Sequence, residues 1–138
     1  MTRGDVHGFV LDTWAVIAYL QGEPSSEIIG DIVGDAMKDG IPVYMSIINV
    51  GEMWYITARE ISSEDADSAV AGLKKWGVEF VGADWNMVRE AAVLKSKHKI
   101  SYADAFAAAL ALSTKATLVT GDKEFEPFEK FMRVKWLR

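Results

Sequence analysis

The sequence predicts an α/β protein, a three-layer α/β/α sandwich with a central parallel sheet of four to five strands. Short apolar runs such as Phe9–Leu11 are typical of strands covered on both faces, as in parallel sheets. Segments with helical spacing separate these runs, and this alternation predicts parallel strands joined by right-handed crossovers. The 138 residues, half of them hydrophobic, suit one core. We therefore expect a single domain over residues 1–138, with residues 1–7 loose.

In the first half of the chain, apolar runs are followed by segments that favour helices. The strand at residues 9–11 ends at Asp12, and the mostly small and apolar residues 15–20 favour a helix directly behind it. Residues 22–26 form a break, in which Pro24 is placed to start the next element. The elements expected next are a helix over residues 27–38 closed by Gly40, a strand over residues 43–46, a helix over about residues 47–59, and a helix that continues to Trp76 from a capping box at Ser62 and Asp65.

The second half of the chain continues the same alternation. The run of small residues after Ser101 indicates a helix buried against close neighbours. The expected elements are a strand over residues 78–81, a helix from about Asp84 to Lys97, a helix from about Ser101 to Leu112, a strand over residues 117–120, a helical turn over residues 124–128 and an edge strand over residues 134–137.

The composition excludes several classes of site. The chain has no Cys, which rules out disulfides and thiolate metal sites, and its only two His residues, His7 and His98, argue against a His-rich zinc centre. No apolar run has the length of a membrane span and no signal peptide opens the chain, so we expect a cytoplasmic protein without a membrane partner. The net charge of -5 counts weakly against a non-specific coat on nucleic acid, but not against an enzyme that holds phosphates through metal ions.

Three acidic residues follow expected strands closely enough to share one edge of the sheet. Asp12 and Asp122 come directly after strand ends, and Glu52 lies within two helical turns of another strand end. All strands of a parallel sheet end at the same edge, so these three side chains are expected near one another. Each also has a simpler interpretation when taken alone: Asp12 and Asp122 as helix N-caps, and Glu52 as a solvated helical residue.

The sequence alone leaves the fourth acid open. Asp84 directly follows the third expected strand, whereas a whole helix separates Asp104 from that strand. Asp104 also lies three residues after Ser101, which is the spacing of a capping box. Topology therefore favours Asp84, and neither residue is eliminated.

Clustered carboxylates predict a particular chemistry. Several carboxylates a few ångströms apart cannot all ionise without a counter-charge. Oxygen ligands suit Mg²⁺ or Mn²⁺, and four acids suffice for one ion or two. Such ions lower the pKa of a bound water and screen the charge of a phosphodiester, which is the chemistry of a metal-dependent nuclease.

Four motifs resemble those of the PIN-domain ribonucleases, most closely the VapC-type toxins of toxin–antitoxin pairs. They are Val10–Thr13, Ile48–Glu52, Ile100–Ala105 and Val119–Phe125, and their order and spacing are similar from about Phe9 to Trp136. The resemblance implies a Mg²⁺- or Mn²⁺-dependent endoribonuclease that hydrolyses RNA with metal-activated water. It implies that the acidic constellation consists of Asp12, Glu52, Asp104 and Asp122. It also favours Asp104 over Asp84, which lies outside the acidic motifs of the family.

The same resemblance suggests supporting roles for four neighbours of the acids. Thr120 takes the family's Thr or Ser position before the last acid and is expected to hydrogen-bond that carboxylate. Thr13 and Asn49 are candidates for contacts behind the metal ligands or to the substrate. Lys123, beside Asp122, is a candidate for a phosphate contact, although a solvated lysine is the simpler interpretation. The basic residues at the end of the helix before Asp104 have the same two interpretations: Lys95, Lys97, His98 and Lys99.

The resemblance also implies partners. VapC-type toxins usually form homodimers and bind an antitoxin whose C-terminal segment lies in an apolar groove leading to the acids, with DNA bound only through the antitoxin. Trp14, Tyr19 and Trp54 are candidates to line this groove, and simple packing is the alternative for each. Trp14 is notable because many relatives carry a smaller residue after the Asp-Thr pair.

The main alternative is a catalytically silent PIN-like protein-binding module. A haloacid-dehalogenase-like phosphatase would need an acid at position 14, where the chain has Trp14. A phosphorylated receiver domain would need a pair of acids at the first strand end and a Lys after the last strand, where Gly121 follows Thr120. Both of these enzyme classes are set aside.

Overall fold

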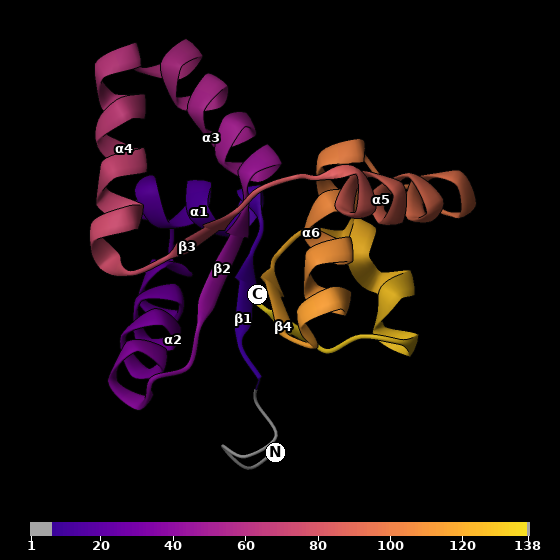
Figure 1. Cartoon of the computed structure of the whole chain (residues 1–138). Coiled ribbons are helices and arrows are strands. Elements are labelled where there is room, and N and C mark those ends of the chain that lie inside the picture. Colours follow the sequence, from indigo (N-terminus) through magenta and orange to yellow (C-terminus); the bar gives the residue numbers. More distant parts are fainter. Residues whose placement is uncertain (1–6, 138) are drawn as a thin grey trace.

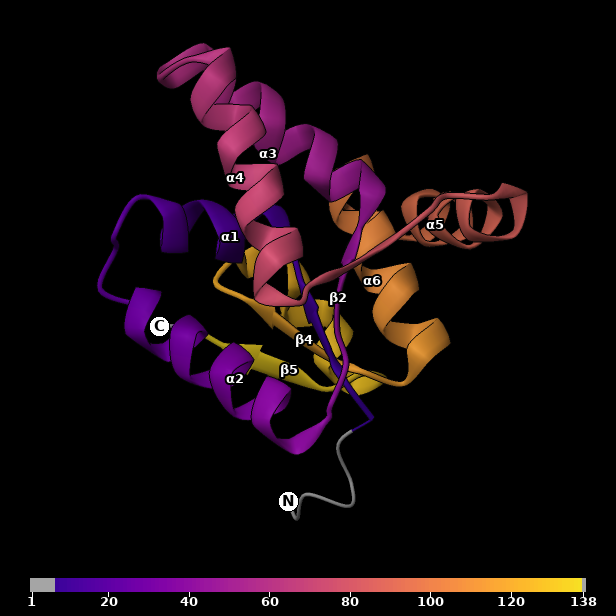
Figure 2. The ribbon, with the colours of Figure 1, turned by 60° about the vertical axis from the view of Figure 1, so that its left-hand side comes forward.

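A computed structural model describes residues 7–137 of the chain. Its five strands form one parallel sheet in the order β3-β2-β1-β4-β5; Figure 1 labels β1 to β4, and Figure 2 shows β5 beside β4. The predicted α/β sandwich is therefore confirmed, with β5 at the expected edge. The expectation that residues 1–7 are loose falls mostly outside the described residues, within which His7 is exposed.

The helices and strands lie close to their expected positions. They are β1 (Phe9–Leu11), α1 (Thr13–Leu20), α2 (Ser26–Asp39), β2 (Val43–Ser46), α3 (Ile47–Glu60), α4 (Ser63–Trp76), β3 (Glu79–Val81), α5 (Trp85–Lys97), α6 (Tyr102–Thr114), β4 (Thr117–Thr120), η2 (Lys123–Lys130) and β5 (Val134–Trp136). Pro24 lies in the turn before α2 rather than at its start, because Ser25 is the N-cap of that helix. The expected turn at residues 124–128 is a longer 3₁₀ segment, η2.

Neighbouring residues of the two central strands point to opposite faces of the sheet. Val10 and Leu118 pack with α5, α6 and η2, whereas Leu11 and Val119 pack with α1, α2, α3 and α4. Helices therefore cover both faces, and Figure 1 shows the strands between these two groups of helices. This is why the strands read as continuous apolar runs.

Helix α6 lies close against the sheet because its side chains are small. All residues from Asp104 to Ala111 are buried, and most of them are Ala. The helix contacts β1, β2 and β4, and its first turn reaches the carboxyl ends of these strands. The small residues of α6 therefore allow Asp104, in its first turn, to lie at the carboxyl edge of the sheet.

The strand order creates a crevice next to β1. The chain passes from β1 outward through β2 to β3, and then returns to the other side of β1 for β4 and β5. Open parallel sheets bind ligands at such a switch point, outside the carboxyl ends of the strands. At the same edge, α3 and α4 form a hairpin that projects past the sheet (Figure 2). None of the helices in residues 7–137 has the length and apolar character to cross a membrane.

Candidate metal centre

Asp12 lies at the centre of the switch point and is completely buried. One carboxylate oxygen accepts a hydrogen bond of 2.8 Å from the backbone N–H of Ala15, so Asp12 is the N-cap of α1. Its other oxygen accepts a hydrogen bond from the hydroxyl of Thr120 at the end of β4. Asp12 is therefore a helix N-cap, and it also lies near other acids, since the charges of Asp122 and Glu52 contribute to raising its pKa.

Thr120 joins the first and the last acidic motif. Its hydroxyl donates to the carboxylate of Asp12 and accepts a 3.0 Å hydrogen bond from the backbone N–H of Asp122. The hydroxyl therefore contacts the carboxylate of the first acid, whereas the sequence analysis expected it to bond that of the last. The physical reason is the adjacency of β1 and β4, which the strand order alone decides.

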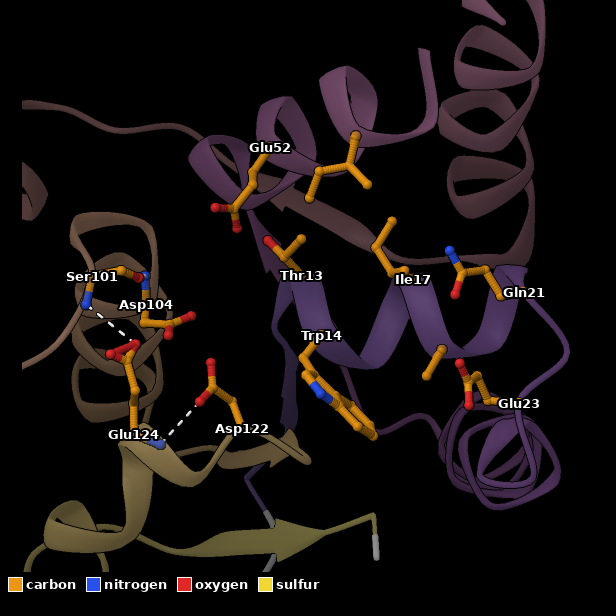
Figure 3. A pocket seen from close by; sticks show the side chains of 12 residues that line it. Thr13, Trp14, Ile17, Gln21, Glu23, Glu52, Ser101, Asp104, Asp122 and Glu124 are labelled. Atoms are coloured by element: carbon orange, nitrogen blue, oxygen red, sulfur yellow. Dashed lines mark hydrogen bonds between the residues drawn. The ribbon is translucent and has the colours of Figure 1, made fainter. Parts of the chain in front are cut away.

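The closest acidic group comprises Asp104, Asp122 and Glu124 (Figure 3). One carboxylate oxygen from each lies within 4.8 Å of those of the other two. Asp122 caps η2 through the backbone N–H of Glu124 at 2.9 Å, and this tight turn directs both side chains toward Asp104. Glu124 was not among the predicted site residues. The signal that could have identified it is a second acid two positions after the one at the strand end.

The structure places Asp104 in the acidic group and Asp84 elsewhere. Asp84 is exposed and caps α5 through the backbone N–H of Met87 at 2.9 Å. Asp104 takes only the backbone half of a capping box, because its N–H donates to Ser101 Oγ at 3.1 Å. The N–H of Ser101 donates to Glu124 at 3.4 Å, which leaves the Asp104 carboxyl directed into the cavity.

Glu52 borders the same cavity from α3. Its side chain is half-buried, and Figure 3 shows its carboxylate turned toward Asp104 and Asp122. The hydroxyl of Tyr55 lies 3.5 Å from Glu52 Oε2, a long hydrogen bond within the same helix. Glu52, Asp104, Asp122 and Glu124 therefore border one cavity, whereas Asp12 is fully buried and does not line it.

The pKa values of two acids at this site, Asp12 and Asp104, are raised. Burial raises the pKa of Asp12 to about 7, against the lowering effect of the bonds from Thr120 and Ala15. Burial also raises the pKa of Asp104 to about 9, reinforced by hydrogen bonds with Asp122 and Glu124. Carboxyl groups this close share protons unless a cation replaces them.

The donor set fits a hard divalent cation. All donors are carboxylate oxygens, and Mg²⁺ binds these at about 2.1 Å, so that two ligands on one ion lie within about 4.2 Å. The three oxygens of the closest group reach that separation with small side-chain movements. Asp104, Asp122 and Glu124 would hold the ion, with Asp12 and Glu52 beside them.

Asn49 connects the elements that carry the acids. Its buried side-chain amide donates to the carbonyl of Ala103 at 3.1 Å and to the hydroxyl of Thr13 at 3.2 Å. These partners are the chain neighbours of Asp104 and Asp12, and Asn49 itself precedes Glu52 by one helical turn. Among residues 7–137, its Oδ1 atom has no hydrogen-bond partner. Asn49 thus lies behind the cavity, whereas Thr13 also borders it.

Asn49→Ala is expected to destabilise the protein by about 1–3 kcal/mol, because it leaves the half-buried carbonyl of Ala103 and the buried hydroxyl of Thr13 without this donor. Urea unfolding in metal-free buffer measures this change. The matched control is Asn86→Ala, since Asn86 is an exposed asparagine in the first turn of α5. Equal stability of both variants would show that the amide does not hold the helices together.

Trp14 lies flat on Gly121. A Cβ atom at position 121 would fall within 2.6 Å of three adjacent ring carbons of Trp14: Cζ2, Cζ3 and Cη2. An approach at the ring edge would be much closer to one of these atoms than to the others. The nearly equal distances therefore place Gly121 under the face of the benzene ring. The bulky Trp14 is accommodated because position 121 has no side chain.

Gly121→Ala is expected to cost about 1–3 kcal/mol of stability, as insertion of a methyl group against a packed ring usually does. In a Trp14→Ala background most of that cost should disappear, which a double-mutant cycle in urea measures. Gly34→Ala is the control, since its Cβ would meet nothing within 4 Å, and it should stabilise α2 by about 0.5–1 kcal/mol. Additive costs for the Gly121 and Trp14 substitutions would contradict the stacking.

The other predicted contact residues lie apart from the acids. Tyr19 stacks on Trp76 of α4, with ring centroids 4.7 Å apart. The indole N–H of Trp54 donates to Asp67 at 2.9 Å. Lys123 is exposed and borders a separate hollow with Trp136. Of the three residues proposed for a partner groove, Trp14 alone borders the acidic cavity.

Two of the four basic residues before Asp104 make contacts within the fold. Lys95 donates to the carbonyl of Ile100 at 2.7 Å, and the ring of His98 lies 4.7 Å from that of Phe128. Lys97 and Lys99 are exposed. Two of the four residues thus have structural contacts.

The fold and the site define the class: a three-layer α/β domain with a carboxylate centre at the switch point of a parallel sheet. The chain belongs to the PIN domain family, whose sequence profile matches residues 9–130. No curated protein matches the chain.

Solved structures similar to the chain include VapBC proteins. VapBC2 of Rickettsia felis, bound to a promoter DNA fragment, has a TM-score of 0.70 at 17% identity, over 92% of this chain and 96% of that one. VapBC-1 of nontypeable Haemophilus influenzae has a TM-score of 0.69 at 20% identity, over 94% and 97%. VapC20 of Mycobacterium tuberculosis, a toxin that cleaves the sarcin–ricin loop, has a TM-score of 0.67 at 17% identity, over 88% and 95%.

Proposed function

We propose that the chain is a divalent-metal-dependent endoribonuclease and the toxin of a toxin–antitoxin pair. The observation that carries this proposal is the group of Asp104, Asp122 and Glu124 at the switch point, with Asp12 buried behind it. Membership of the PIN domain family supports a nuclease. The likeness to VapC20, a toxin that cleaves the sarcin–ricin loop, supports RNA as the substrate class.

The chain's own residues bind and orient the reacting groups. Asp104, Asp122 and Glu124 would hold Mg²⁺ or Mn²⁺ at the mouth of the cavity, and Glu52 faces the same space. The bound ion supplies positive charge for the phosphodiester and lowers the pKa of a water. Thr120 and the N–H of Ala15 hold the Asp12 carboxylate in place. The side chain of Asn49 on α3 connects this helix to α1 and α6 through its bonds to Thr13 and Ala103.

Cleavage of a mixed RNA pool tests this proposal. The purified chain should cut RNA in Mg²⁺ or Mn²⁺, and EDTA should abolish cutting, as seen on a denaturing gel. Asp104→Asn serves as the contamination control. Absence of cleavage together with tight binding of a protein partner would instead support a catalytically silent PIN-like module.

Soaking crystals in Mn²⁺ and recording anomalous scattering would count the ions and identify their ligands.

The proposed partners are a cognate antitoxin and a second copy of the chain. Several similar structures are toxin–antitoxin complexes, one of them bound to promoter DNA, and these support an antitoxin that carries the DNA contact. The partner's inhibitory segment is expected to enter the cavity beside Trp14. Light scattering on the isolated chain measures whether it is a dimer, and inhibition of RNA cleavage by the co-expressed antitoxin tests the pairing.

A further inference from the structure

The cavity at the acidic centre has two chemically different parts. Its volume of about 400 Å³ is within the usual range for small-ligand sites. Figure 3 shows Glu52, Asp104, Asp122 and Glu124 around one part, and Trp14 and Ile17 with Gln21 and Glu23 around the other. Ile56 also lines the cavity. A nucleotide likewise has a charged phosphate and a base, whose flat faces can stack on an aromatic ring and whose edges form hydrogen bonds.

The indole of Trp14 is held in one plane. Gly121 lies under the benzene ring, so the ring cannot move toward β4. Thr13 and Asp12 fix the chain directly before Trp14 through their bonds to Asn49 and Ala15. Trp14 is half-buried, and it borders the cavity. An aromatic side chain that Gly121 holds in place therefore borders the same cavity as the carboxylates.

We propose that the indole of Trp14 is the stacking surface for the nucleobase adjacent to the scissile phosphodiester. This inference rests on the proposed function, because it takes RNA as the substrate. Unpaired RNA bases stack on aromatic side chains, and such stacking tolerates any base because every base has a π-face. Because Gly121 blocks movement of the ring on one side, the indole has less conformational freedom to lose when a base binds, which lowers the entropic cost of binding.

Steady-state cleavage of a short single-stranded RNA tests the role in substrate binding. Trp14→Ala should raise KM by about 5- to 100-fold, the range for loss of one base–aromatic stack, with little change in kcat. Trp14→Phe keeps an aromatic face and should recover most of the affinity. Trp85→Ala is the matched control, because Trp85 is 69% exposed on α5 and should leave KM unchanged.

A binding measurement gives a readout independent of turnover. Nucleoside 5′-monophosphates, titrated in Mg²⁺, should quench the tryptophan fluorescence of the wild type, and Trp14→Phe should lose this quenching. Ribose 5-phosphate, which has no base, should quench neither protein. Equal quenching by ribose 5-phosphate, or full quenching of Trp14→Phe, would overturn the inference.

The two measurements separate this inference from the proposed function. If the wild type cleaves RNA but the Trp14 variants match it in KM and quenching, the stacking surface is wrong and the nuclease stands. If the wild type does not cleave RNA but Trp14 still reports the base, the nuclease proposal fails, and Trp14 contacts a bound nucleotide without a role in cleavage. If Trp14→Ala weakens only the inhibition by a protein partner, the indole of Trp14 contacts that partner rather than a base, and the inference is overturned.

Discussion

Asp104→Asn is expected to lower the rate of RNA cleavage by more than about a hundredfold. Loss of a residue behind a metal ligand already costs about 10- to 100-fold, and Asp104 belongs to the closest group of candidate ligands. An amide cannot carry the negative charge that the cation requires. The measurement is single-turnover cleavage of a labelled RNA in saturating Mg²⁺.

The same substitution should leave the stability unchanged or increase it. Burial holds the pKa of Asp104 at about 9, so without metal the group is neutral at pH 7, and Asn has nearly the same shape. Replacing it also removes a carboxylate from a crowded group, a frequent result when active-site residues are replaced. A markedly lower melting temperature in EDTA would contradict this and would support a structural role for the carboxyl. Asp84→Asn, at the exposed cap of α5, is the matched control for activity.

Without metal, the protein is expected to lose stability as the pH rises. Asp12 and Asp104 have an ordinary value of 3.8, but in the fold the pKa values are about 7 and about 9. Below about pH 4 both groups are protonated in the folded and the unfolded chain, and their contribution to stability is fully present. Above that the unfolded chain releases its protons first, so the contribution is lost as the pH passes through 7 and then 9.

Magnesium should reverse this trend, because a cation binds the ionised carboxylates and replaces their protons. Thermal unfolding at several pH values, in EDTA and in Mg²⁺, measures the effect. We expect Mg²⁺ to raise the melting temperature by at least about 5 °C at pH 8.5, and much less at pH 5. A stabilisation by Mg²⁺ that is the same at both pH values would contradict a site built on these two carboxyls, and Asp104→Asn should reduce it.

Local patterns in the sequence determined most of the architecture. Apolar runs, capping residues and Gly40 identified the strands and helices, because each depends on neighbours along the chain. The parallel arrangement then placed Asp12 and Asp122 at one edge, since both follow strand ends directly. The PIN resemblance added Asp104, where topology alone had favoured Asp84.

Only the tertiary structure decided the rest, because it depends on which distant segments become neighbours. Thr120 bonds Asp12 rather than the carboxylate of Asp122, since β4 pairs with β1. Glu124 joins the acids through a 3₁₀ turn that has no strong local signature. Tyr19 and Trp54 pack against α4, away from the acids, because the α3–α4 hairpin offers them an aromatic ring and a carboxylate. The sequence by itself thus determined the elements and two strand-end acids, whereas strand order and helix packing decided which side chains share the cavity.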